Sequence, residues 1–446
     1  MRLKNIKEEL ETYGYKFDLS KTMMWIAIGG IIVVAVGRTF GLPAMYMIAL
    51  AGGLGFVAPF FITCVLKVQF EEKRFAEINI YMEQLLYSFQ KSGKILTSLR
   101  DVQQLFESGN MYDAIGESIS YMEHTYDGED ITGDALGILE ERYPANLLFT
   151  IHKYCNQVEI NGGESVMGIN LLLEARRMWA DRCMELMKQK RQKVLQIVLS
   201  VIISVFMCWM LVTVGKRMNI DICQYAITRV TMVITLWINV LIIYRGCKSL
   251  SKSLCETRMP GEEILDKIAK LQRHSETTGF HPMDGVLKRE VTKALEQVFP
   301  QWLLQVSLLL QGENVQVALA KSYEDAPVLM KPFLRKLLQD LRDNPTDMMA
   351  YVNFMQEYNL PQVQSTMKML YSISEGSGGV ASVQIEDIIR RNQIMYDQSE
   401  KMKNSDEMAG MYALFLAPQV TAGVKMLVDM FVMFYGMMSA GFVMGG

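Results

Sequence analysis

The chain has 446 residues, of which 50% are hydrophobic, and its formal net charge is −3. A charge so close to neutral gives no general case for nucleic-acid binding. The seven cysteines form no CxxC pair and no regular spacing, so neither a disulfide framework nor a zinc site is expected. Long stretches almost free of charge alternate with charged segments, which is typical of membrane spans separated by water-exposed domains.

Residues 1–66 are predicted to form an N-terminal cytoplasmic segment and a transmembrane hairpin. Apolar segments run from about residue 22 to residue 36 and from residue 44 to residue 66, with only a short turn between them. A secretory signal peptide fits the first segment poorly, because acidic residues precede it and no small-residue cleavage site follows.

Residues 194–247 are predicted to form a second transmembrane hairpin. The stretch Val194 to Val214 holds no charge over 21 residues, which corresponds to about 31 Å of helix and is enough to cross the hydrocarbon of a bilayer. The next span runs from about Ile227 to Tyr244, and Arg229 near its outer end can extend to the interface.

The last apolar stretch, residues 408–446, contains only Lys425 and Asp429 as charged residues. Two interpretations stay open for it: one long helix kinked at Pro418, or two short passes that turn near Lys425.

The rich lysine and arginine clusters all lie on one side of the predicted spans, and the other side receives only two short turns, one of which holds Lys216 and Arg217. This asymmetry places the charged segments in the cytoplasm and the chain in the inner or plasma membrane as a multi-pass protein. The flanking residues are Arg2, Lys4, Lys7, Lys16, Lys21, Lys67, Lys73, Arg74, Lys188, Lys190, Arg191, Lys193, Arg245, Lys248 and Lys252.

The two charged segments, residues 67–193 and 248–407, are predicted to be cytoplasmic helical bundles. Their apolar residues recur at three- and four-residue spacing and show no sustained alternation, so strands are not expected. Proline marks the predicted helix breaks. These breaks are Met259-Pro260-Gly261, Phe299-Pro300, Ala326-Pro327, Asn344-Pro345 and Leu360-Pro361.

The layout of the two segments is similar. In each, an apolar helix stops at a glycine, Gly93 or Gly312, and another apolar helix follows. Later glycine pairs open a helix that carries two arginines. These pairs are Gly162-Gly163 and Gly378-Gly379. The interval between the glycines is 69 residues in the first segment (93 to 162) and 66 in the second (312 to 378). Matched intervals in the same order favour an internal duplication.

These motifs resemble the type II secretion system F family, the inner-membrane platform proteins of type II secretion, type IV pilus and Tad pilus machines. The first copy matches through Leu85, Leu86, Gly93, Leu96, Leu99, Gly162, Gly163 and Glu164. The second matches through Leu304, Gly312, Leu319, Gly378 and Gly379. Val380 stands where the family has a glutamate, and the opening hairpin is typical of the Tad branch.

The resemblance implies an all-α, polytopic membrane protein with two repeated cytoplasmic helical bundles. It also implies a scaffold that couples a cytoplasmic ATPase to the extraction of pilin or pseudopilin subunits from the lipid bilayer. The implied assembly is a homo-oligomer, or a hetero-oligomer with a paralogous platform protein.

No enzyme active site, cofactor site or metal site is expected. Gly93-Lys94 lacks the other residues of a phosphate-binding loop. The histidines His124, His152, His274 and His281 show no paired-ligand spacing, and each is interpreted as a surface or satisfied bundle histidine.

Residues 101–141 contain eleven acidic residues and neither lysine nor arginine. They are interpreted either as a solvated helical face or as a docking surface for a basic region of the ATPase. The candidate docking residues are Glu117, Glu123, Asp127, Glu129 and Asp130.

The alternative function is a membrane transporter or channel. It requires polar or charged residues at mid-membrane depth on several spans, and only Lys425, Asp429 and Arg229 are candidates in the sequence.

Overall fold

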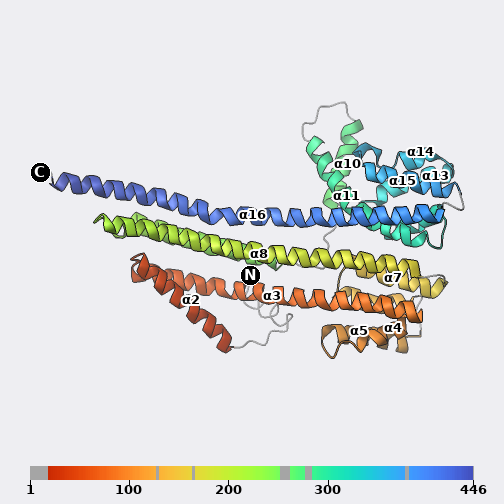
Figure 1. The fold of residues 1–446 in the computed structure, drawn as a ribbon, viewed down its shortest axis with the longest axis horizontal. Helices are drawn as coiled ribbons and strands as arrows, with labels where there is room; N and C mark the ends of the chain where they lie inside the picture. The colour runs from red at the N-terminus through yellow and green to blue at the C-terminus, as the bar shows by residue number, and fades with distance from the viewer. Residues whose placement is uncertain are drawn as a thin grey trace. The chain divides into compact units, whose positions relative to one another are not determined.

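A computed structural model of the chain describes residues 19–126, 130–162, 166–251, 262–276, 284–376 and 381–444 (Figure 1). Within these ranges every regular element is helical and no strand occurs, which confirms the all-α fold class. The chain forms two compact units. The first unit comprises Met1–Arg74, Met184–Leu254 and Asp406–Gly446, and the second comprises Phe75–Cys183 and Cys255–Ser405.

The first unit contains the apolar helices. Among the described residues, four helices are long and apolar enough to cross a membrane: α3 (Ala44–Ser92), α8 (Val166–Arg217), α9 (Ala226–Leu250) and the Met408–Met438 part of α16 (Ala381–Met444). The first predicted span lies in α2 (Leu19–Thr39), where the apolar helix Gly29–Thr39 is shorter. Residues 408–444 belong to one helix that includes Pro418, so the structure has the long-helix form of this segment.

The apolar surface of these helices is largely uncovered by protein. In the most apolar window of each of the four, only 11% to 28% of the residues are buried by the rest of the chain. Exposed side chains in them include Ile48, Phe56, Leu195 and Phe431. Leaving so much apolar area in water is unfavourable by about 25 cal/mol per Å², so a hydrocarbon environment accounts for it.

Helices of the first unit pack through small residues and a shared apolar core. A side chain at Gly53 of α3 would collide with the ring of Trp237 in α9, because an added Cβ would lie 1.8 Å from it. Small residues at such contacts let membrane helices approach closely. The buried apolar residues of this core include Val33, Phe40, Leu50, Cys208, Val212, Ile222, Met232 and Ala422.

The second unit contains the two bundles. The first bundle is built from the end of α3, then α4 (Ile95–Gln103), α5 (Asn110–His124), α6 (Ile131–Arg142), α7 (Asn146–Asn161) and the start of α8. Apolar spacing explains its packing, because Ile95, Leu99 and Val102 recur on one face of α4 and all three are buried. Helix α4 contacts both α5 and α7, and α5 packs on α6.

The second bundle is built from the later helices of the chain. It contains α10 (Glu262–Glu276), α11 (Asp284–Leu309), α12 (Val315–Asp325), α13 (Lys331–Asp343), α14 (Met348–Val352), α15 (Pro361–Ser374) and the start of α16. The short 3-10 helices η1 (Ile222–Gln224) and η2 (Gln356–Tyr358) precede α9 and α15. Trp302 is fully buried at the centre of this bundle, and Ile388 and Met395 of α16 belong to the same core.

Three of the predicted proline breaks coincide with helix ends, whereas the break at Pro300 is wrong. Helices α12 and α13 end just before Pro327 and Pro345, and α15 begins at Pro361. Pro260 lies outside the described residues. Pro300 lies inside α11, which continues through it.

Core packing outweighs the hydrogen bond that this proline removes. Pro300 has no N–H to donate to the carbonyl one turn earlier, but Val298 and Trp302 on either side of it are buried, and most helical stability in proteins comes from such packing. With its amide turned over, Asn392 of α16 donates to the Pro300 carbonyl oxygen at 3.0 Å and accepts from the Leu304 nitrogen at 3.3 Å.

Candidate functional site

The described motif glycines lie between helices. Gly93 follows α3 with φ +63°, and Gly162 ends α7 with φ +69°. Gly312 lies between α11 and α12 without a positive φ. Gly163, Gly378 and Gly379 lie outside the described residues. Gly376 follows α15 with φ +78°, much as Gly162 follows α7. Gly376 is not among the glycines named from the sequence.

Replacing Gly93 with alanine is expected to destabilise the first bundle by about 1 kcal/mol, because an L-residue is strained at φ +63°. The added Cβ itself meets nothing within 4 Å at Gly93 or at Gly312. Gly312→Ala is therefore the matched control, with an expected effect below about 0.5 kcal/mol. Hydrogen exchange in α3–α4 and in α11–α12 measures the loss of stability in each variant. Equal losses of stability in Gly93→Ala and Gly312→Ala would contradict the assignment of strain to Gly93.

The acidic residues of 101–141 have counter-charges that the sequence analysis did not count. Glu117 forms an ion pair with Arg142, and Glu123 accepts a hydrogen bond from Arg100 at 2.5 Å. Asp130 caps α6 by accepting from the Gly133 nitrogen at 2.8 Å. Asp127 and Glu129 lie outside the described residues.

These contacts correct one premise of the docking hypothesis. The stretch itself contains no lysine or arginine, but Glu117 and Glu123 each meet an arginine from just outside it. Their partners, Arg100 and Arg142, flank the acidic stretch directly in the sequence and reach it because α4, α5 and α6 pack together. Exposed ion pairs of this kind contribute about 0–1 kcal/mol to stability. A basic partner could therefore replace Arg100 and Arg142 as the counter-charges at little energetic cost.

A buried polar chain crosses the first bundle. The Tyr81 hydroxyl lies 2.9 Å from His152 Nε2, and His152 Nδ1 lies 2.8 Å from a Glu140 oxygen. Burial raises the pKa of Tyr81 well above its ordinary value, which keeps the phenol neutral. His152 is thus a satisfied bundle histidine. His124 is an exposed one at the end of α5. His281 and the His274 side chain lie outside the description.

No group of three or more histidine, cysteine, aspartate or glutamate side chains in the described part of the chain is arranged to hold a metal ion.

Polar side chains are buried between the apolar helices of the first unit. Lys425 and Asp429 of α16 form an ion pair one helical turn apart, and both side chains are essentially inaccessible. Ser200 of α8 donates to the Phe415 carbonyl oxygen of α16 at 2.9 Å. The sequence analysis found the charged pair and missed the serine, because a serine in an apolar span gives no signal of which neighbour it faces.

The neighbouring helix α9 contributes further polar groups. Asn239 of α9 donates to Ser204 of α8 at 3.4 Å, and Thr228 and Thr235 of α9 are also buried. Arg229 instead donates to the Cys223 carbonyl oxygen at 2.6 Å, so it stays at the end of α9. Polar groups buried among membrane helices are hydrogen-bonded to one another or serve a function.

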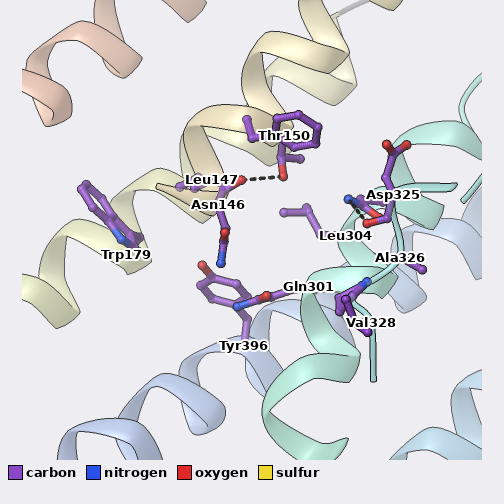
Figure 2. A pocket seen from close by; sticks show the side chains of 13 residues that line it. Asn146, Leu147, Thr150, Trp179, Gln301, Leu304, Asp325, Ala326, Val328 and Tyr396 are labelled. Atoms are coloured by element: carbon purple, nitrogen blue, oxygen red, sulfur yellow. Dashed lines mark hydrogen bonds between the residues drawn. The ribbon is translucent and has the colours of Figure 1, made fainter. Parts of the chain in front are cut away.

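A cavity of about 300 Å³ opens within the second unit, where the two bundles meet (Figure 2). Figure 2 shows Asn146 of α7, Gln301 of α11 and Tyr396 of α16 pointing toward one another. Trp179 of α8 forms another part of the wall, and the exposed Phe149 lies among the lining residues. No sequence motif indicates this cavity, because its walls come from α7, α8, α11, α12 and α16 and from the loop after α12, which together span much of the chain.

Over the residues that the structure describes, the protein is all-helical and has four helices long and apolar enough to cross a membrane. Comparisons with family models, curated proteins and solved structures found no match for the chain. The function is therefore argued from the helices and sites described above.

Proposed function

We propose that the chain is a multi-pass scaffold of the inner or plasma membrane that serves as the platform of a pilus-assembly or type II secretion machine. In this role it couples a cytoplasmic ATPase to the movement of pilin or pseudopilin subunits out of the bilayer. One observation carries the proposal: each bundle ends in a helix, α8 or α16, that continues without a break into an apolar span.

Unbroken helices suit such a coupling role. A helix transmits displacement along its axis because its backbone hydrogen bonds run along that axis. In α8 the helix extends from Val166 through the charged end of the first bundle to Arg217, and α16 extends in the same way from Ala381 to Met444. A displacement of either bundle would therefore move side chains inside the membrane.

The order of helices supports a duplicated bundle, as the resemblance implies. In the first bundle α3, α4, α5, α6, α7 and α8 succeed one another with Gly93 after the first and Gly162 after the fifth. In the second, α11 to α16 succeed one another with Gly312 and Gly376 at the same places. Helix α12 contacts α15 as α4 contacts α7. A duplication explains both the order and these contacts.

The topology is the first test. A cysteine placed at the exposed Ser120 or Val328, with the seven native cysteines replaced, should resist an impermeant thiol reagent in intact cells and react after permeabilisation. A cysteine at Asn219, in the short turn between α8 and η1, should react in intact cells and is the matched control. Labelling of residue 120 or 328 in intact cells would reject a cytoplasmic location.

The partners are the second test. Photo-crosslinkers at Tyr112 and Tyr121, both exposed on α5, the helix that also carries Glu117, should capture a secretion-type ATPase in native membranes. Raising salt should lower the yield, because complementary charges at a surface are screened. A crosslinker at Met348, exposed in the second bundle, is the control for the site. Capture of unrelated proteins only, or no capture, would contradict the platform role.

A transporter or channel is the alternative, and one observation favours it. Buried polar side chains occur on all four apolar helices described above, namely α3, α8, α9 and α16, whereas the sequence had indicated charged candidates without partners on other spans. Solute or ion flux through proteoliposomes that is lost in Asn239→Leu would support transport over the platform role.

A further inference from the structure

The cavity between the two bundles has the size and position of a small-molecule site. Its volume of about 300 Å³ lies at the lower end of the range for such sites, which are commonly found where domains meet. Beside it, Lys153 of α7 and Asp325 of α12 form an ion pair that joins the bundles. Any molecule in the cavity would touch both bundles at once.

Side-chain amides dominate the polar lining. Asn146 and Gln301 each present a carbonyl oxygen and an NH₂ group, and Gln305 presents a carbonyl oxygen while its NH₂ group donates to the Asp325 carbonyl oxygen at 3.5 Å. Together they match neighbouring donors and acceptors on one ligand edge. The Gln301 and Gln305 carbonyl oxygens accept no hydrogen bond from any described residue. A buried acceptor without a donor is unfavourable, and a ligand N–H reached by a small side-chain rotation would satisfy it.

The remaining lining residues favour a flat, uncharged ring. Trp179 and Tyr396 supply aromatic surface. No lysine or arginine is among the residues that line the cavity, and the only carboxylate, that of Asp325, is already paired with Lys153. A phosphate group would thus enter without a counter-charge, which is costly.

We propose that this cavity binds an uncharged nucleobase or nucleoside, held by the Gln301 and Gln305 amides and by the Trp179 and Tyr396 rings. Glutamine and asparagine recognise base edges through paired hydrogen bonds, and aromatic or apolar side chains enclose a base that has left its stack. The site is independent of the platform role. A ligand bound there would contact both bundles and so hold them together.

Equilibrium dialysis of the full chain in detergent micelles tests the site, with adenosine, guanosine, cytidine and uridine as probes. At least one nucleoside should bind at one molecule per chain, and its 5′-monophosphate should bind at least about tenfold more weakly. The variant Gln301→Met/Gln305→Met keeps the side-chain length and removes both amides. It should weaken binding by about tenfold or more, since each hydrogen bond lost contributes severalfold.

Two further variants guard against a trivial result. Gln362→Met changes an exposed glutamine of α15 that bonds Gln398, and it should leave nucleoside binding unchanged. Thr150→Phe fills the cavity from α7 and should abolish binding even if the double glutamine variant is unstable. Circular dichroism confirms the helical content of each variant.

Three results would overturn the proposal: no binding of any of the four nucleosides at millimolar concentration, equal binding of the monophosphate, or binding that survives both Gln301→Met/Gln305→Met and Thr150→Phe.

Discussion

Replacing Asp429 with leucine is expected to destabilise the first unit by about 3–5 kcal/mol, because the change leaves the Lys425 ammonium buried without its counter-charge. The Lys425 side chain is 1% exposed and that of Asp429 is 0% exposed, so water cannot replace the lost carboxylate. The free energy of unfolding, measured by denaturant titration in mixed micelles, should report this loss. Lys425→Leu should cost a comparable amount, since it leaves a buried carboxylate.

Helix α16 itself supplies the control. Lys401 and Asp397 form an ion pair with the same four-residue spacing, but their side chains are 73% and 48% exposed. Asp397→Leu should therefore cost less than about 1 kcal/mol. The double variant Lys425→Leu/Asp429→Leu should recover most of the stability lost in either single variant, because no buried charge remains. Equal losses for Asp429→Leu and Asp397→Leu would show that burial of the inner pair does not govern its energy.

Sequence reasoning predicted the features that depend on one continuous segment. The uncharged run Val194 to Val214 lies in α8, and residues 227–244 lie in α9, because twenty apolar residues in succession indicate a span whatever surrounds them. Each of these inferences needs only the local sequence and the period of a helix.

Features that depend on a second segment could not be predicted in this way. The hydrogen bond from Asn239 to Ser204 joins α9 to α8, and nothing in either helix alone specifies that partner. The break predicted at Pro300 fails for the same reason, since burial of Val298 and Trp302 against other helices of the second bundle keeps α11 continuous. The cavity likewise exists only where α7, α8, α11, α12 and α16 meet.

The acidic stretch shows an intermediate case. Its counter-charges, Arg100 and Arg142, stand immediately before and after residues 101–141 in the sequence. A wider window would have included both arginines, but only the packing of α5 between α4 and α6 shows which carboxylates they meet. The docking surface on α5 stays a prediction, with less unbalanced charge than the sequence indicated.

Replacing Trp302 with alanine is expected to destabilise the second bundle by about 3–5 kcal/mol, since it removes a fully buried indole from the centre of a packed core. The ring lies 5.5 Å from Phe299 and 5.9 Å from Phe354, measured between ring centroids. Its Nε1 donates to the Ser322 hydroxyl at 3.0 Å. Hydrogen exchange in α11, α12 and α15 should accelerate by about 10²–10³-fold if these helices open together.

The hydrogen bond and the ring can be separated. Trp302→Phe keeps an aromatic ring at the centre and loses the donor, and Ser322→Ala loses only the acceptor. Ser322→Ala should cost about 1–3 kcal/mol, because it leaves the buried indole N–H without a partner. Helix α5 of the first bundle serves as the internal reference, and its exchange should not change if the two bundles open independently. A Trp302→Ala protein whose α11 exchanges as slowly as the native one would place the core of the second bundle elsewhere.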